Sequence, residues 1–251
     1  MRVVGYIDGM NFYEAGKDKA WYPAGWCNWK ETLAAYCPDA VVSIRYFTTL
    51  YAGRTKTRVK RQTLHLRAMK EVAKAEIIYG SCRERPINCP KCKLTLRCRC
   101  GCSRRFTEKM TDVNIAVRLV EDAVDNVFDR AYVVSADVDL LAAIHAVLRR
   151  APKSKLVVLI PPESVVSEEF ANLERDYPGR AVARHLDLGK LRRFPDDLPG
   201  RWGEKLPPHW RKDSGKRPAD PDTRLVSPPG RHVPWYEESV GFGSKQSRKS
   251  G

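Results

Sequence analysis

Short apolar segments without a polar face recur along this chain and alternate with segments of helical spacing. The clearest are residues 3–7, 131–135 and 155–160, all rich in Val, Ile or Leu. A strand that is apolar on both faces must be covered on both sides, as in a parallel sheet between two layers of helices. The pattern therefore predicts an α/β fold of three layers with a parallel sheet.

Further elements follow from hydrophobic spacing and from residue type. The sequence "TDVNIAVRLVEDAVDN" predicts the clearest helix, with Thr111 as its cap, Ile115, Leu119 and Val120 on one apolar side and Val124 nearby. Helices are also expected from about Met10, over 29–36, over 58–75, from about Val138 and over 167–177. Strands are expected over 40–51 and 76–80, and an edge strand over 180–187.

Length and composition set the domain organisation. The 251 residues and the 43% hydrophobic content suit one sizeable globular domain, which we expect over residues 1–195. The remainder, 196–251, is a basic segment rich in Pro and Gly without periodicity, and we expect it to be mostly disordered.

The charge of the chain favours anionic partners. A formal net charge of +15 attracts polyanions and releases counterions on binding, and nucleic acid is the commonest such partner. Asp8 interrupts the first apolar run, so no secretory signal is expected there. Because no segment approaches about 18 consecutive apolar residues, we expect no membrane span and a cytoplasmic location.

Four aspartates lie at the ends of expected elements. Asp8 ends the first strand, Asp112 lies in the first turn of a helix, and Asp137 and Asp139 follow another strand. Taken singly, each has a local role in a turn, at a helix dipole or in a cap. Together at the carboxyl edge of a parallel sheet they would repel one another, and a divalent cation would remove that penalty. Oxygen ligands suit Mg²⁺ or Mn²⁺, which bind phosphate oxygens.

Three segments resemble the NYN domain family of PIN-like ribonucleases, in its bacterial form. They are "YIDGMNFY", "EKMTDVNIAVRLVEDA" and "YVVSADVDLLAAI", in that order and separation, and the resemblance extends over roughly residues 1–210. It implies a Rossmann-like domain with a metal-dependent nuclease centre. Ala136 stands where the family commonly has Gly. The family's acidic positions fall on Asp8, Asp112, Asp137 and Asp139, and its polar positions on Asn11 and Ser135.

The inferred chemistry is hydrolysis of a phosphodiester, with RNA as the favoured substrate. One or two Mg²⁺ or Mn²⁺ ions held by the aspartates would activate water and neutralise charge on the phosphate. Asn11 would orient a metal-bound water or a phosphate oxygen, and Lys109 is a candidate phosphate contact or simply a solvated lysine.

Clustered cysteines predict a small zinc-binding insertion over residues 82–105. Cys89-Pro-Lys-Cys92 has the spacing of a zinc knuckle, and reducing conditions in the cytoplasm disfavour disulfides. We expect a structural Zn²⁺ held by four of Cys89, Cys92, Cys98, Cys100 and Cys102, with the ligand set left open. Free thiols, a redox pair and an iron–sulfur cluster are alternatives, and Cys27 and Cys37 are expected to be packing residues.

Basic residues in two places predict contacts with a nucleic-acid backbone, against the alternative of solvated surface. The candidates are Arg104, Arg105 and Lys109 near the insertion and Arg58, Lys60 and Arg61 in the expected helix. Aromatic residues nearby, including Trp26, Tyr46 and Phe47, are candidates for base stacking but are more often core residues.

Two other functions compete with a nuclease. A non-catalytic RNA-binding adaptor would keep the fold and the basic surface, although a pure binder gains nothing from carboxylates that repel phosphate. A nucleotide-sugar transferase would use Asp137-Val-Asp139 as a metal-binding motif, but it leaves Asp8 and Asp112 unexplained.

Overall fold

The computed structural model describes residues 1–16, 19, 26–50, 56–86, 88 and 104–195, and only the backbone of 56–58, 84–86 and 104–106. The chain divides into two units, Met1–Arg217 and Pro218–Gly251, and every described residue belongs to the first. The predicted tail, 196–251, and the cysteines from Cys89 to Cys102 lie outside the described residues.

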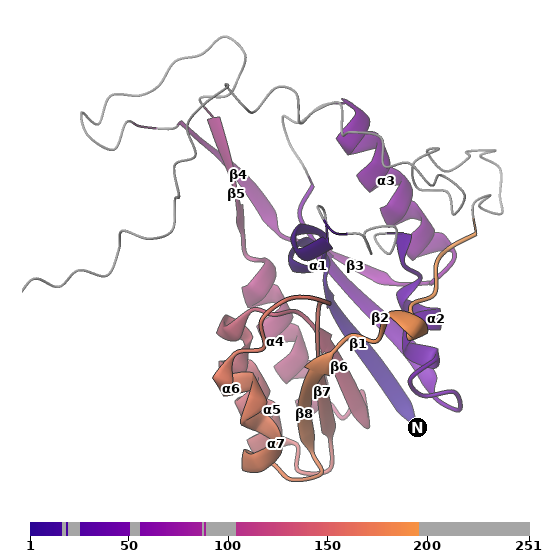
Figure 1. Cartoon of the computed structure of the whole chain (residues 1–251), viewed down its shortest axis with the longest axis vertical. Helices are drawn as coiled ribbons and strands as arrows, with labels where there is room; N and C mark the ends of the chain where they lie inside the picture. Colours follow the sequence, from indigo (N-terminus) through magenta and orange to yellow (C-terminus); the bar gives the residue numbers. More distant parts are fainter. Residues whose placement is uncertain (17–18, 20–25, 51–55, 87, 89–103, 196–251) are drawn as a thin grey trace, which may run out of the picture. The chain divides into compact units, whose positions relative to one another are not determined.

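One sheet of six strands runs through the first unit in the order β3-β2-β1-β6-β7-β8 (Figure 1). Every neighbouring pair in it is parallel, which confirms the predicted sheet. The strands are β1 (Arg2–Asp8), β2 (Val41–Thr48), β3 (Glu76–Tyr79), β6 (Arg130–Val134), β7 (Lys155–Ile160) and β8 (Ala181–His185). A separate antiparallel hairpin joins β4 (Ser81–Pro86) to β5 (Arg104–Lys109).

Helices cover both faces of the sheet, so the fold has the three layers that were predicted. On one face α1 (Gly9–Gly16), α2 (Trp29–Ala34) and α3 (Lys56–Glu71) supply core residues such as Phe12, Leu33 and Met69. On the other face α4 (Thr111–Val124), α5 (Leu141–Arg150), α6 (Glu168–Ala171) and α7 (Leu173–Asp176) supply Ile115, Ile144 and Phe170. Alternate residues of each strand enter the two cores because successive side chains point to opposite faces.

Several predicted boundaries differ from the structure. The segment from Val138 begins with a 3₁₀ turn, η2 (Val138–Leu140), before α5, and the helix predicted over 167–177 is two short helices that meet at Asn172. The β4–β5 hairpin and the 3₁₀ turn η3 (Leu188–Lys190) were not predicted. The helix over 111–126 is confirmed as α4, although Val124 is 60% exposed and does not join the core.

The prediction that Thr111 caps α4 is wrong. Met110 occupies the cap position with a left-handed backbone (φ 79°), and no side chain caps the first turn. Thr111 is buried and its hydroxyl donates instead to Glu108, at the end of β5. The partner of this hydroxyl is therefore a residue three positions earlier in the sequence, in the strand that precedes the helix.

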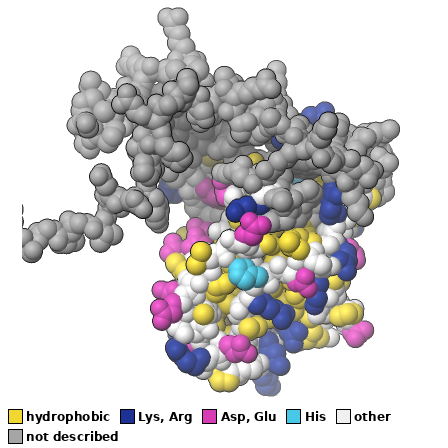
Figure 2. Space-filling model, viewed as in Figure 1, with side chains coloured by type: hydrophobic (Ala, Val, Ile, Leu, Met, Phe, Trp, Pro, Cys, Tyr) yellow, Lys and Arg dark blue, Asp and Glu magenta, His cyan; other side chains and the backbone are white. Residues whose placement is uncertain are grey.

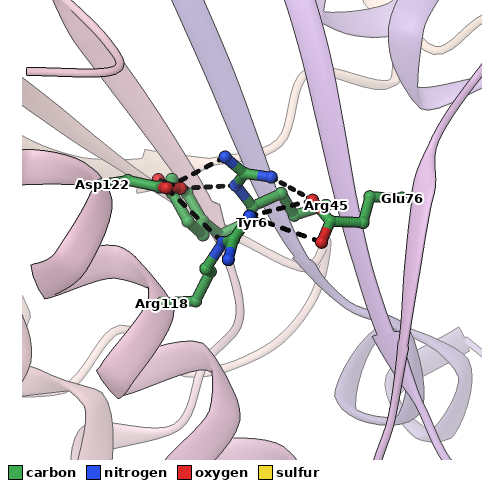
Figure 3. Close-up of polar contacts among 5 residues, drawn as sticks. All are labelled: Tyr6, Arg45, Glu76, Arg118 and Asp122. Atoms are coloured by element: carbon green, nitrogen blue, oxygen red, sulfur yellow. Dashed lines mark hydrogen bonds and ion pairs between the residues drawn. The ribbon is translucent and has the colours of Figure 1, made fainter. Parts of the chain in front are cut away.

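A network of charged side chains fixes α4 to the sheet (Figure 3). Asp122 of α4, 4% exposed, accepts hydrogen bonds from the Tyr6 hydroxyl (2.6 Å) and from Arg45 Nη2 (2.9 Å). Arg45 also pairs with Glu76 of β3, and Arg118 contacts both Glu76 (3.3 Å) and Asp122 (3.4 Å). Burial, and then the Asp122 carboxylate, raise the pKa of Tyr6, so this phenol remains a donor. The network ties β1, β2 and β3 to one helix.

Buried aromatic residues and thiols follow the packing interpretation. Trp26, Tyr46 and Phe47 are at most 6% exposed, so these three rings belong to the core rather than to a base-stacking surface. Cys27 and Cys37 are buried as predicted, and burial raises the pKa of the Cys27 thiol to about 12. Within the described ranges, no helix has both the length and the apolar character needed to cross a membrane.

Candidate active site

The candidate site lies where the strand order reverses. From β1 the chain moves outward through β2 to β3, and it returns to β6, on the other side of β1, before β7 and β8. In open parallel sheets, ligands bind outside the carboxyl ends of the strands at such a point. Asp8 ends β1 and Ser135 directly follows β6, so both lie at this point of the sheet.

Asp8 is a buried carboxylate held by two hydrogen bonds. It is 3% exposed, its Oδ1 accepts from the backbone N–H of Asn11 (2.9 Å), and its Oδ2 accepts from the Ser135 hydroxyl (3.0 Å). Burial raises the pKa of Asp8 to about 7, against the effect of these two hydrogen bonds, and the charges of Asp112 and Glu108 act in the same direction as burial. A carboxylate in this position would be stabilised by a bound cation.

Asn11 and Ser135 connect Asp8 to the segment after β6. The backbone N–H of Ala136 donates to Asn11 Oδ1 (3.0 Å), and the backbone N–H of Asp137 donates to Ser135 Oγ (3.1 Å). Asn11 Oδ1 is therefore engaged by the backbone, and its Nδ2 is the atom available to a ligand. These bonds fix the turn that presents Asp137.

Asp112, Asp137 and Asp139 face the same region. Asp112, in the first turn of α4, keeps contact with solvent, and partial burial raises its pKa together with the charges of Asp137, Glu108 and Asp139. Asp137 caps η2, its Oδ1 accepting from the backbone N–H of Asp139 (2.9 Å). The interpretation of Asp137 as a capping residue is thus correct. The cap uses only Oδ1, so Oδ2 takes no part in this hydrogen bond.

Glu108 is a member of the cluster that sequence reasoning missed. Its Oε1 accepts from the buried hydroxyls of Thr49, at the end of β2 (2.8 Å), and of Thr111. Gly80 packs against both threonines, because a Cβ there would lie 2.5 Å from Thr111 Oγ1 and 2.9 Å from Thr49 Oγ1. Glu108 stands beside Lys109 in "EKMTDVN", but nothing in the local pattern placed it beside Thr49.

The oxygen-only donor set of this cluster fits a hard divalent cation such as Mg²⁺ or Mn²⁺. Asp8 alone is buried, while Asp112 and Asp139 retain solvent contact. Among the described residues, no three His, Cys, Asp or Glu side chains are already gathered closely enough to form a metal-binding group. The charges of Asp112 and Glu108 raise the pKa of Asp8, and those of Asp137, Glu108 and Asp139 raise the pKa of Asp112, so a cation bound here would relieve a repulsion that is already present.

The predicted basic contacts lie on α3 and on the hairpin. Lys60 is exposed and Arg61 is partly buried on α3, and Lys109 is exposed at the end of β5. Gln62 of α3 donates to the Thr49 backbone carbonyl (2.7 Å), which connects this helix to the end of β2. The side chains of Arg58, Arg104 and Arg105 lie outside the described residues. On the face in Figure 2, basic and acidic side chains are interspersed.

The cysteine insertion is described only at its two ends. Residues 81–86 and 104–109 pair as β4 and β5, so the expected insertion of 82–105 begins and ends within a hairpin. Cys82 of β4 is partly buried with a free thiol. The five predicted zinc ligands, Cys89, Cys92, Cys98, Cys100 and Cys102, lie outside the described residues, so the zinc site stays a prediction.

Comparison with known proteins assigns no family to the chain. No family model matches it, and no curated protein matches it significantly. Among solved structures, a protein of unknown function from Vibrio parahaemolyticus is similar to it, with 18% identity and a TM-score of 0.41. The match covers 72% of this chain and 91% of that one. The NYN resemblance therefore stays a prediction.

Proposed function

We propose that this chain is a metal-dependent nuclease that hydrolyses phosphodiester bonds, with RNA as its substrate. One observation carries the proposal: Asp8 is buried at the switch point of a parallel sheet, and burial, together with nearby carboxylates, raises its pKa to about 7. Such an arrangement is unfavourable in an empty protein and favourable with a cation. Carboxylates that destabilise the fold without a ligand are typical of a functional site.

The acidic side chains that would hold Mg²⁺ or Mn²⁺ are Asp8, Asp112, Asp137 and Asp139. When bound, the ion would supply Lewis-acid stabilisation of the phosphate and lower the pKa of a bound water. Ser135 and the Asn11 backbone hold the Asp8 carboxylate in one orientation through their two hydrogen bonds. A fixed carboxylate avoids reorganisation when charge develops on the phosphate.

Other residues of the chain would bind the substrate. Asn11 lies in the first turn of α1, and its Oδ1 already accepts from the backbone N–H of Ala136. Its Nδ2 would therefore be the atom that donates to the substrate. Lys109 is exposed at the end of β5, three residues before Asp112, and carries a charge that attracts a phosphate. The net charge of +15 supports a polyanionic substrate, and the resemblance to NYN ribonucleases favours RNA.

A structural Zn²⁺ is a second part of the proposal. Four of the five cysteines between Cys89 and Cys102 would hold it, and the metal would supply folding energy to a segment too short for its own core. The segment connects β4 to β5, and β5 leads through Glu108 and Lys109 to the acidic cluster. Zinc content of the purified chain, measured by mass spectrometry of metals, tests this part.

The test of the nuclease is cleavage of end-labelled single-stranded RNA with Mg²⁺ or Mn²⁺. Asp137→Asn is expected to reduce the rate by about 100-fold or more, because it removes charge that acts on the transition state. Asp129→Asn is the matched control, since Asp129 pairs with Arg2 at the opposite edge of the sheet. EDTA is expected to abolish cleavage by the wild type.

Two results would change the assignment. Cleavage that persists unchanged in Asp137→Asn refutes the acidic site. RNA binding that weakens with salt, without cleavage under any divalent ion, identifies the adaptor in place of the nuclease. The same assay with DNA of equal sequence tests the choice of RNA.

A further inference from the structure

The outer face of α4 carries an apolar stripe that no described residue covers. Val113, Val117 and Val124 are 61%, 50% and 60% exposed, and Val120 between them is partly buried. These positions are i, i+4, i+7 and i+11, which form one continuous stripe on a helix. We refer to the four residues as the valine stripe.

The valine stripe is not the core face of the helix. The opposite face of α4 is already buried through Ile115 and Leu119, both 0% exposed. A surface helix normally has charged or polar residues on its outer side, and an apolar outer face indicates a contact with another molecule. Single exposed valines elsewhere, such as Val165, have no such continuity.

The stripe continues at both ends of α4. Met110, at the N-terminal end, is 57% exposed. At the C-terminal end a pocket of about 560 Å³ is lined in part by Val120 and Val124 and by Arg150 and Lys153 from the end of α5 and the loop after it. An exposed apolar side chain at one end and an empty pocket at the other suit an antiparallel partner.

We propose that the valine stripe pairs two copies of this chain through an antiparallel contact of α4 with α4. The four valines are separated by four, three and four residues, so their pattern reads the same from either end of the helix, with its midpoint between Arg118 and Leu119. A two-fold axis at that point sets Val113 opposite Val124 of the second copy, and Val117 opposite Val120. An isologous interface requires this kind of self-complementary patch.

The flanks of the stripe support a second copy as the partner. On one side Ala116 is small and only partly buried, so the two helices can approach closely there, whereas Ala123 belongs to the core at 2% exposure. On the other side lie Asn114 and Glu121, and antiparallel pairing sets the amide of one copy near the carboxylate of the other. No like charges among these flanking residues oppose each other across the contact. The two-fold also brings Met110 of each copy toward the pocket at the other copy's Val124.

Sedimentation velocity of the full-length chain tests the proposal. A contact built on one helix is smaller than a standard interface, so we expect a weak dimer with Kd on the order of 10 μM. Val117→Glu is expected to weaken it at least about tenfold, because the carboxylate would be buried against valines. Val165→Glu is the control, since Val165 is 86% exposed outside the stripe.

A charge exchange tests the antiparallel register. Val113→Glu and Val124→Lys should each weaken self-association, and an equimolar mixture should restore dimer, because the carboxylate introduced in one copy then meets the ammonium introduced in the other. Parallel pairing would give no such rescue. A chain that is monomeric up to about 300 μM, a dimer insensitive to Val117→Glu, or a mixture without rescue overturns the proposal. Unchanged thermal melting of each variant shows that the fold is intact.

Discussion

Asp122→Asn is expected to destabilise the domain strongly although Asp122 lies in no predicted site. The Asp122 side chain is 5% exposed and that of Arg45 is 12% exposed, so the ion pair is nearly removed from water. The carboxylate accepts from the Tyr6 hydroxyl and twice from Arg45. An amide offers one acceptor oxygen and no charge, which leaves the Arg45 guanidinium buried with only Glu76 as a formal counter-charge.

The expected cost is about 2–4 kcal/mol of the free energy of unfolding. Removing one partner of a buried pair typically costs about 3–5 kcal/mol, and we place this case lower because the Glu76 side chain remains bound to Arg45. With a urea m-value of about 2 kcal/mol/M, the midpoint should fall by roughly 1–2 M. Urea unfolding followed by circular dichroism measures it.

Two companion variants test whether an unpaired buried charge causes the loss of stability in Asp122→Asn. Asp129→Asn breaks the exposed pair with Arg2, in which the side chains are 54% and 45% exposed, and should leave the urea midpoint unchanged within error. Arg45→Met combined with Asp122→Leu and Tyr6→Phe removes both charges and the buried hydroxyl that would lose its acceptor. This variant should be less destabilised than Asp122→Asn alone, because no buried charge or donor is left unpaired. A midpoint for Asp122→Asn equal to that of Asp129→Asn would refute the reasoning.

Three further predictions follow from single positions. Burial lowers the pKa of His65 to about 4, so below about pH 6.5 the unfolded chain binds a proton that the folded chain does not. The free energy of unfolding should therefore decrease as the pH falls from about 6.5 to about 4. His65→Phe should make this decrease smaller, as measured by urea unfolding at about pH 7.5 and about pH 5.0. Gly9→Ala should lower the free energy of unfolding in urea by about 1–3 kcal/mol, because a Cβ at Gly9 lies 2.5 Å from Tyr46 Oη. The same variant should bind Mn²⁺ more weakly in calorimetry. An unchanged urea midpoint contradicts this contact. Asp8→Asn should raise the melting temperature at pH 8 in EDTA, because it removes a buried charge beside Asp112 and Glu108. It should also abolish RNA cleavage. A lower melting temperature contradicts the inference that the charged Asp8 destabilises the metal-free fold.

The tertiary structure decided where distant residues meet. Glu108 reaches Thr49 across 59 residues of sequence, and Tyr6 reaches Asp122 across 116. Neither contact has a local pattern in the sequence. The bond from the Thr111 hydroxyl to Glu108 is local by contrast, because the two residues are three positions apart. The β4–β5 hairpin escaped prediction because charged residues dominate both strands, which leaves no apolar alternation to detect.

The sequence by itself determined the parallel sheet and the positions of the acidic residues along it. Strands such as Lys155–Ile160 are apolar on both faces, and only a sheet covered on both sides can bury them, so composition sufficed. Asp8, Asp137 and Asp139 were assigned to one edge because parallel strands bring their carboxyl ends together, and the NYN resemblance added Ser135. In the structure, Asp8 Oδ2 lies 3.0 Å from Ser135 Oγ. That Asp8 is nearly excluded from water, and that Glu108 acts on it, depends on the packing of β5 and α4 around it. Burial is a property of the assembled layers, and no single segment encodes it.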